Sequence, residues 1–448
     1  MTSTLNDAGL LGLDLRARRS RAPEEMVLVA LPDMQGRLQG KRMPAGYFAE
    51  HVAETGAEFC AYLLATDIDM QPLDGYAHAS WATGYGDMHV VPDLATMRRL
   101  AWPGGGVLVL ADACDATGAN LSIAPRTMLR RQLGLLQQEL GLTAKVGVET
   151  EFTVYRGTGS AALDQLQPVS ERNLDYHLTH PRPMRDFLHS LEEALTGSGL
   201  PLESTKTEAA PGQVEVTFRY GDPIEAADNH CILKHAAHQL GEATDVTPVF
   251  MAAPQTGIGN GLHVHLSLWE DHKPVLASDD GGLLPAGHQA IAGLVEVLPH
   301  LMPLLLSTPN SYKRLRPNTF APTHMSWGWD NRTCAIRVAG HGRNRHLEIR
   351  VPGADANPYL ALTAVIAAIR DGTGRHLTPP APVGDNTTAP VLPATLDAAL
   401  HLFASSKPAA DLLGPDVVSH YSTAAHHEIE AMNTEVTDIE RCRGFARA

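Results

Sequence analysis

The sequence has few of the features that mark secreted or membrane-spanning proteins. Its 448 residues include only five cysteines, which are widely separated and form no CxxC pair. An odd number of scattered cysteines argues against a disulfide framework and indicates a reducing compartment. No apolar run approaches the roughly 18 residues that a membrane-spanning helix needs. At the N-terminus the basic residues follow a short apolar stretch, the reverse of a signal peptide. We therefore expect a soluble, cytoplasmic protein with no membrane partner.

Basic charge is also scarce. Lys and Arg total 35 against 50 Asp and Glu, which gives a net charge of −15. Binding to nucleic acid through counterion release needs a basic face, so nucleic acid is not an expected partner. A small anion can still be bound by a few local arginines. Hydrophobic residues make up 44% and charged residues 19%, a composition that excludes a disordered chain and allows a large core.

Several familiar motifs are absent. The segment GRLQGKR from Gly36 has three residues instead of four between its glycines, and Arg42 stands where a phosphate loop needs Ser or Thr. The glycine-rich segment 257–261 precedes a strand-like pattern instead of the helix of a dinucleotide fold. The string beginning at His427 has Ala431 where a zinc protease needs its second histidine, and no GxSxG occurs.

The order of helix and strand patterns predicts an α+β fold, because the two kinds of element do not alternate regularly. The turn-rich segment from Asp112 to Pro125 is the best domain boundary. The proline-rich stretch 373–394 predicts a long surface loop, and the last fifty residues are helical in pattern. Hydrophobic patterns predict strands near 26–31, 106–111, 145–155, 213–219, 262–269 and 333–338, and helices near 45–55, 127–140, 184–196, 223–245, 286–307 and 356–371.

Carboxylates gather on the predicted strands. In VGVETEFTVY, Glu149 and Glu151 are two residues apart, so both point to one face of a strand. Glu208 and Glu215 flank a Pro-Gly turn that can bring them toward one point. In this apolar setting, two carboxylates on one face repel each other unless a cation lies between them. A single glutamate of this kind is more often a solvated strand-edge residue, so the argument depends on the whole set.

Two further strands add ligand types. His263 and His265 share one face of NGLHVHLSLW, and Glu348 and Arg350 share one face of RHLEIRVPG. A site rich in oxygen with few nitrogens suits Mg²⁺ or Mn²⁺ instead of structural zinc. More than one carboxylate pair suggests more than one ion, and hard cations beside arginines are the equipment for phosphoryl transfer.

Arginines form a second group. Arg314, Arg332 and Arg337 lie in NSYKRLRPNTFAPTHMSWGWDNRTCAIRV. Any one of them could be a salt-bridged surface residue. Arg332 and Arg337 stand among apolar and aromatic residues, where an unpaired buried charge would be costly, so we predict that they bind anionic groups.

These strings together resemble the type I branch of the glutamine synthetase family. The matching segments are GVETEF, TEAAPGQVEV, GNGLHVHLSLW, NSYKRLRP, WGWDNRTCAIRV and LEIRVPGADANPYLA, in the family's order over residues 149–361. Weaker matches reach back to about residue 32. The resemblance implies a β-grasp-like N-terminal domain, 24–112, and a catalytic domain, 118–448, with a curved antiparallel sheet and flanking helices. It also implies a homo-oligomer, usually a dodecamer of two hexameric rings, with sites shared between neighbouring subunits.

The resemblance implies ATP-dependent ligation of glutamate to an amine through a γ-glutamyl phosphate, with ATP and two or three Mg²⁺ or Mn²⁺ ions per site. By likeness, one ion would be held by Glu151, Glu208 and Glu215, and another by Glu149, His263 and Glu348. His265 and Ser267 would line the nucleotide site, and Arg337 would face ATP. Glutamate and the transferred phosphate would be bound by Arg314, Arg332, Arg350 and the backbone of Gly259.

One departure from the family concerns the amine. In the flap after NSYKR, glutamine synthetases carry a glutamate that closes over the ammonium site, whereas this chain has Phe320. An aromatic ring cannot act as a base, but it can bury a carbon substituent, and each buried methylene contributes about 0.8 kcal/mol. Phe320 resembles the glutamate–amine ligase branch, such as the γ-glutamylmethylamide and γ-glutamylethanolamide synthetases. The alternatives are that Phe320 only packs the flap of an ordinary glutamine synthetase, or that the protein is a silent structural or regulatory member.

Other departures lie nearby. Lys206 and Thr207 replace the paired histidines that usually precede the Glu208 position, and His346 replaces an arginine. The usual Asp-Gly-Ser-Ser loop is absent. Four residues are candidates for the amine side of the site, namely Asp67, Asp69, Asp87 and Tyr176. The segment NTTAPVLPATL lacks the tyrosine that many bacterial members adenylylate, so we predict no such regulation. The identity of the amine stays open.

Overall fold

The computed structural model of the chain describes residues 25–383, 389–445 and 447. Parts of several sequence predictions fall outside these residues. In the first part of the chain they are the N-terminal stretch compared with a signal peptide and residue 24 of the expected first domain. In the expected catalytic domain they are residues 446 and 448 and residues 384–388 of the predicted surface loop, which include Asn386 to Thr388 of the segment without a tyrosine.

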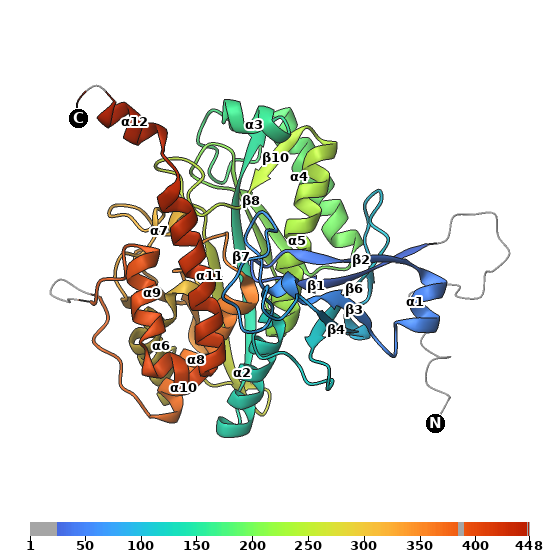
Figure 1. The fold of residues 1–448 in the computed structure, drawn as a ribbon. Coiled ribbons are helices and arrows are strands. Elements are labelled where there is room, and N and C mark those ends of the chain that lie inside the picture. Colours follow the sequence, from blue (N-terminus) through green and yellow to red (C-terminus); the bar gives the residue numbers. More distant parts are fainter. Residues whose placement is uncertain (1–24, 384–388, 446, 448) are drawn as a thin grey trace.

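The first part of the chain forms a six-stranded sheet in the order β2-β1-β6-β4-β3, with β5 paired to β6. Strands β1 and β6 are parallel, and the other pairs are antiparallel. The elements are β1 (Met26–Pro32), β2 (Leu38–Pro44), α1 (Ala45–His51), β3 (Ala57–Cys60), β4 (Asp87–Pro92), β5 (Arg98–Arg99) and β6 (Val107–Cys114). In Figure 1 this sheet lies to the right of the rest of the molecule.

The second part contains a nine-stranded sheet in the order β13-β14-β15-β11-β7-β9-β8, with β10 paired to β7 and β12 to β11. Apart from β13 and β14, its pairs are antiparallel. The strands are β7 (Thr143–Arg156), β8 (Leu202–Thr207), β9 (Gln213–Phe218), β10 (Val246–Val249), β11 (Leu262–Glu270), β12 (Lys273–Pro274), β13 (Trp327–Trp329), β14 (Ile336–Ala339) and β15 (His346–Ile349).

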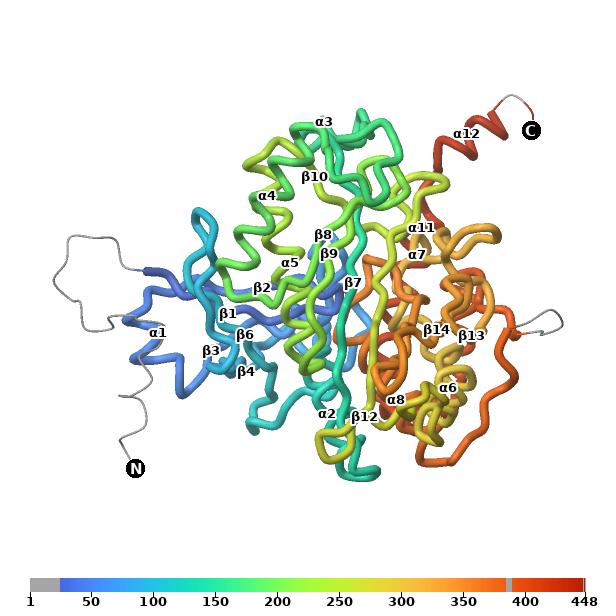
Figure 2. The backbone as a smooth tube through the Cα atoms, turned by 180° about the vertical axis from the view of Figure 1, so that it is seen from behind, coloured from blue at the N-terminus to red at the C-terminus, as the bar shows by residue number. Residues whose placement is uncertain are grey.

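Helices flank the long central strand β7 in two groups (Figures 1 and 2). Helices α4 and α5 lie on the side of the N-terminal sheet, and α6 and α8 to α11 form the group on the other side. Helix α12 projects from the body with the C-terminus. The bounds are α2 (Pro125–Leu140), α3 (Gly159–Gln165), α4 (Arg182–Gly197), α5 (Pro223–Ala243), α6 (Pro285–Val297), α7 (Pro309–Tyr312), α8 (Pro358–Gly374), α9 (Leu396–Ala404), α10 (Lys407–Leu413), α11 (Pro415–Thr434) and α12 (Asp438–Gly444).

Alternation along β7 separates the core from the polar face of the sheet. Val146, Val148 and Phe152 are buried, while Glu149 and Glu151 point to the opposite face. Phe152 belongs to an apolar cluster that joins residues of α4 and α5 to residues of β6. The two sheets therefore share buried contacts although no strand pairs between them in the described ranges.

A buried charge network also joins the two parts. Arg126, at the start of α2, is 2% exposed. Its guanidinium donates to Asp93 and Asp112 of the N-terminal part, each at 2.9 Å, and to Asp228 of α5 at 3.0 and 3.1 Å. Tyr359 of α8 also donates to Asp228. Arg126 and its acidic partners thus connect α2 to four other segments, namely the turn at Asp93, β6, α5 and, through Tyr359, α8.

The α+β prediction is confirmed, with a small N-terminal sheet followed by a larger, mainly antiparallel sheet with flanking helices. Two details differ. The helix predicted over 286–307 ends at Val297 and continues as a 3₁₀ helix, Leu298–Leu304, because two prolines in that segment remove helical donors. No strand was predicted at β8, because its sequence LESTKT has no clear hydrophobic pattern. We propose to keep the division into 24–112 and 118–448, because each range has its own sheet. None of the described helices is long and apolar enough to cross a membrane.

A buried histidine predicts acid sensitivity. His420 of α11 packs against the ring of Tyr76, with 4.7 Å between the ring centres, and burial lowers its pKa to about 3. Because His420 binds a proton more readily in the unfolded state, protonation favours unfolding. The contribution of neutral His420 to the free energy of unfolding is therefore complete above pH 6.5 and is lost as the pH falls toward 3. Between pH 6.5 and pH 5 the loss is about 2 kcal/mol. Urea unfolding at both pH values should show a smaller pH dependence for His420→Gln than for the wild type. If the free energy of unfolding changes equally with pH in the wild type and in His420→Gln, His420 does not contribute to the acid sensitivity.

Candidate active site

The candidate site is built by the register of neighbouring strands. Across the sheet, Glu149 of β7 faces His263 of β11, and Glu151 of β7 faces Glu215 of β9. His265 of β11 faces Glu348 of β15. Since directly paired residues point to the same face, these side chains form a polar row on the face opposite the apolar core.

The row contains two clusters of possible metal ligands. Glu149, His263 and Glu348 form the first cluster, and Glu151, Glu208 and Glu215 form the second cluster. Within each cluster the candidate ligand atoms lie within 4.8 Å of one another. The family resemblance implied these two groups of three, and the structure brings the members of each group together.

Histidines and arginines compensate the charge of the first cluster. Nδ1 of His263 lies 3.4 Å from Glu149 Oε2, and Nε2 of His265 lies 2.9 Å from Glu149 Oε1. Burial opposes the charge of Glu149, but these histidines hold its pKa well below its usual range. For Glu348, burial is likewise outweighed by His263, Arg350 and His265, and its pKa is lowered to about 2.

The second cluster has an excess of negative charge. Burial and the charges of Glu149 and Glu208 raise the pKa of Glu215 to about 9. Glu151 Oε2 accepts the backbone N–H of Gly261 at 2.5 Å, which leaves its other oxygen available. A divalent cation between these carboxylates would relieve their repulsion.

Arginines border both clusters. The Arg350 guanidinium pairs with Glu348 and donates to the Phe320 carbonyl at 3.3 Å. Arg314 is buried, donates to the carbonyls of Arg350 and Val351 at 3.2 and 3.1 Å, and lies 3.4 Å from His263 Nε2. Burial lowers the pKa of Arg314 to about 10.

Arg337 pairs with Glu348 at 2.8 Å and with Asp330 at 2.5 Å. Arg332 does not follow the prediction that it would be a buried charge. It is exposed, and its charge lowers the pKa of Asp330, where the hydrogen bond from Arg337 has the largest effect. Arg332 lies in the turn before β14, where Asp330 and Thr333 are also exposed and burial begins at Cys334.

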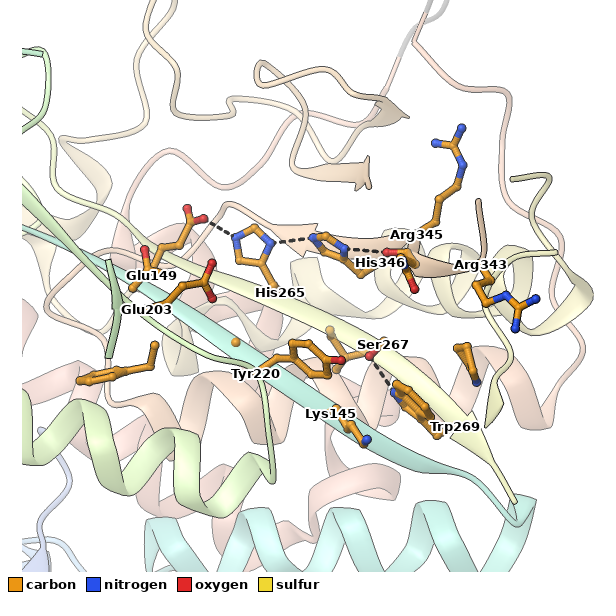
Figure 3. Close-up of a pocket in the computed structure, with 16 residues that line it drawn as sticks. Lys145, Glu149, Glu203, Tyr220, His265, Ser267, Trp269, Arg343, Arg345 and His346 are labelled. Carbon is orange, nitrogen blue, oxygen red and sulfur yellow. Dashed lines mark hydrogen bonds and ion pairs between the residues drawn. The ribbon is translucent and has the colours of Figure 1, made fainter. Parts of the chain in front are cut away.

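A cavity of about 490 Å³ begins at Glu149 and continues along β11 (Figure 3). His265 and Ser267, the predicted nucleotide residues, both line it. His265 Nδ1 lies 3.0 Å from His346 Nε2, and Ser267 Oγ accepts the indole N–H of Trp269 at 2.8 Å. Lys145 and Arg343 line the cavity at the end away from Glu149 and offer positive charge to an anion there.

Gly259 and Tyr176 lie at the other end of the row. A Cβ on Gly259 would come within 3.0 Å of Arg314 Cγ, so a side chain there would crowd this arginine. The Gly259 carbonyl accepts the Gln213 amide N–H at 2.8 Å. Tyr176 is exposed, and its ring lies 4.8 Å from Lys206 Nζ, beside the second cluster.

The remaining candidates are Phe320 and three aspartates of the N-terminal part of the chain. In the described part of the chain, no hydrogen bond or ion pair joins Asp67, Asp69 or Asp87 to either cluster. The Asp67 carboxylate accepts the N–H groups of Asp69 and Gln71, which closes its own turn. Asp87 is exposed at the start of β4. Phe320 is 67% exposed.

Two residues next to the ligands were missed by the sequence analysis. The side-chain nitrogen of Gln213 lies 3.4 Å from Glu151 Oε2. It also donates to the Gly259 carbonyl and to Asn260 Oδ1, and these bonds fix the segment before β11. Lys206 was noted only as a departure from the family, but its ammonium pairs with Glu208 and lies 3.4 Å from Glu215 Oε2. The QVEV alternation could have indicated that Gln213 and Glu215 share a face.

The donor set fits hard divalent cations. Five of the six ligands are carboxylates, the sixth is an imidazole, and there is no cysteine among them. Two such clusters beside arginines and a cavity define an enzyme that handles anionic substrates.

The chain belongs to the glutamine synthetase family, whose catalytic domain matches residues 122–443. It is 40% identical to gamma-glutamylethanolamide synthetase GlnA4 of Streptomyces coelicolor over 441 residues, covering 97% of this chain and 95% of that protein. It is 30% identical to glutamate–isopropylamine ligase of a Pseudomonas species, covering 92% and 93%. A solved structure described as a GmaS/ADP complex matches with a TM-score of 0.80 at 27% identity, covering 94% of this chain and 97% of that one. The predicted family is therefore confirmed, and its enzymes use ATP and divalent metals.

Proposed function

We propose that this protein ligates the γ-carboxylate of glutamate to a small organic primary amine at the expense of ATP. The observation that carries the proposal is the pair of ligand clusters on one sheet face, next to an elongated cavity. The relatives named for ethanolamine and isopropylamine support an organic amine over ammonium.

In the proposed reaction, an oxygen of the γ-carboxylate attacks the terminal phosphorus of ATP, and ADP leaves. The amine nitrogen then attacks the acyl carbon, and phosphate leaves with that carboxylate oxygen. Divalent ions would be held by the first cluster and the second cluster, where they would neutralise phosphate and carboxylate oxygens.

The protein's own side chains would position the substrates. His265 and Ser267 would contact the nucleotide in the cavity, with Arg337 beside Glu348. Arg314, Arg350 and the exposed Arg332 would hold the glutamate carboxylates and the transferred phosphate, and Gly259 would leave room for the glutamate backbone. Tyr176, next to the second cluster, would line the amine pocket.

We propose that Asp67, Asp69 and Asp87 act from a neighbouring subunit. These carboxylates lie on the N-terminal part of the chain, apart from the clusters of their own subunit. A ring in which one subunit's N-terminal sheet covers the next subunit's site would bring them to the amine. The expected assembly is a homo-oligomer, a dodecamer of two hexameric rings.

The proposal is tested by phosphate release with glutamate, ATP and a panel of amines. Methylamine, ethanolamine, isopropylamine, a diamine, an aromatic amine and ammonium should be compared by kcat/KM. We expect at least one organic amine to exceed ammonium. If ammonium exceeds every organic amine, the protein is an ordinary glutamine synthetase, and if no amine supports turnover, it is a silent family member.

Phe320 provides a prediction about amine choice. Phe320→Glu introduces a carboxylate that favours ammonium and removes apolar surface that favours a carbon substituent. The ratio of kcat/KM for ammonium to that for the best organic amine should rise by about tenfold, since burying one or two methylenes contributes about 1–2 kcal/mol. Phe320→Leu, which keeps the apolar character, should change the ratio much less. An unchanged ratio in Phe320→Glu would show that Phe320 only packs its own loop.

A further inference from the structure

Lys206 occupies an unexpected place in the site. It lies on β8, opposite Glu215 of β9, and therefore points to the same face as the ligands. Its ammonium pairs with Glu208 and lies 3.4 Å from Glu215, so it contacts two of the three carboxylates of the second cluster. The first cluster has histidines and arginines around it, and no lysine among its ion pairs in the described residues.

The Lys206 ammonium lies against the carboxylates of Glu208 and Glu215, and opposite charges attract strongly at such short separations. The ammonium thus supplies part of the positive charge that the three carboxylates need.

We propose that Lys206 is a tethered cation that competes with a divalent metal ion for the second cluster. A divalent ion bound by Glu208 and Glu215 and the ammonium of Lys206 would need the same oxygens and would repel each other. The ring of Tyr176, 4.8 Å from Lys206 Nζ, offers the displaced ammonium a second contact. Metal binding at this cluster therefore includes the cost of moving Lys206 away from Glu208 and Glu215.

This inference rests on the proposed metal sites, and it is tested by metal binding without ATP or amine. Free Mn²⁺ measured by electron paramagnetic resonance during titration of the full-length protein gives the number and affinity of bound ions. The wild type should bind one ion tightly and a second at least about tenfold more weakly. We call the tightly bound ion the first class of Mn²⁺ sites and the weakly bound ion the second class. Lys206→Met should raise the affinity of the second class by about tenfold or more and leave the affinity of the first class unchanged.

Three control variants show whether the change in Mn²⁺ affinity comes from the charge of Lys206 at the second cluster. Lys206→Arg keeps a cation and should keep the weak class. Lys273→Met removes an exposed lysine of β12 and should leave both classes as in the wild type. Glu208→Gln added to Lys206→Met should weaken the tightened class again, which locates that class at the second cluster.

The result that overturns the inference is a Lys206→Met isotherm that matches the wild type. Equal tightening of both classes would also overturn it, because that is a general effect of net charge. Loss of the second class in Lys206→Met would do the same, since Lys206 would then position the carboxylates for the metal. The proposed function has a separate test, because it fails when the wild type ligates no amine, whatever these isotherms show.

Discussion

Glu151→Gln is expected to lower kcat/KM for the amine ligation by about 10²–10³ or more while leaving the protein folded. Glutamine has the shape of glutamate and can still accept the N–H of Gly261, so the strand register is kept. The variant removes one negative charge from the second cluster, where a divalent cation would bind. Loss of activity with unchanged thermal stability, measured by phosphate release and by thermal unfolding, would separate the chemical role from a structural one.

The matched control for this variant is Glu242→Gln on α5. Glu242 is exposed and belongs to neither cluster, so the same chemical change should leave kcat/KM within about twofold of the wild type. Activity of Glu151→Gln above one tenth of the wild type would contradict the placement of Glu151 among the metal ligands.

Arg126→Met is expected to lower the free energy of unfolding by about 3–5 kcal/mol. Arg126 is buried and donates to Asp93, Asp112 and Asp228. Methionine fills similar space but removes the ion-pair partner of the buried Asp228 and leaves Asp93 and Asp112 with Arg130 alone. Because the network joins the N-terminal sheet to α2 and α5, the loss should appear as a lower urea midpoint for both parts of the chain.

Arg130→Met provides the comparison. Arg130 also pairs with Asp93, at 2.6 Å, but its side chain is 39% exposed. Solvent screens such a pair, and its removal should cost less than about 1 kcal/mol. If the two variants have the same urea midpoint, the network does not stabilise the contact between the two parts.

Five of the six ligands could be predicted because they lie on strands with a regular alternation, whereas Glu208 follows the end of β8. Glu149 and Glu151 share a face by spacing alone, and so do His263 and His265. The division of the six ligands into two groups came from the resemblance to a family, because spacing within a strand does not say which strands are neighbours. The observed register supplies the physical reason for that division.

The position of Lys206 next to the second cluster could not be predicted. Strand β8 has a mixed polar sequence, LESTKT, and its pairing with β9 contains an irregularity between Leu202 and Ser204. A one-residue change of register would turn Lys206 to the other face, so its position depends on pairing that the sequence does not specify.

Arg332 illustrates the opposite case. Its aromatic and apolar sequence neighbours favoured a buried charge, yet the turn before β14 exposes its side chain. A turn has no regular alternation of faces, so the buried residues near Arg332 in the sequence do not determine the side to which Arg332 points. Asp67, Asp69 and Asp87 were predicted from their place in the chain, and the role that we propose for them requires a second subunit.

The most direct test of ligation through a γ-glutamyl phosphate is an isotope transfer measured by mass spectrometry. Glutamate labelled with ¹⁸O in both γ-carboxylate oxygens is incubated with ATP, Mg²⁺ and the best amine of the panel. The account predicts one ¹⁸O atom in each phosphate released and one in the γ-glutamyl amide formed. Unlabelled phosphate, or phosphate release without an amide product, would contradict it.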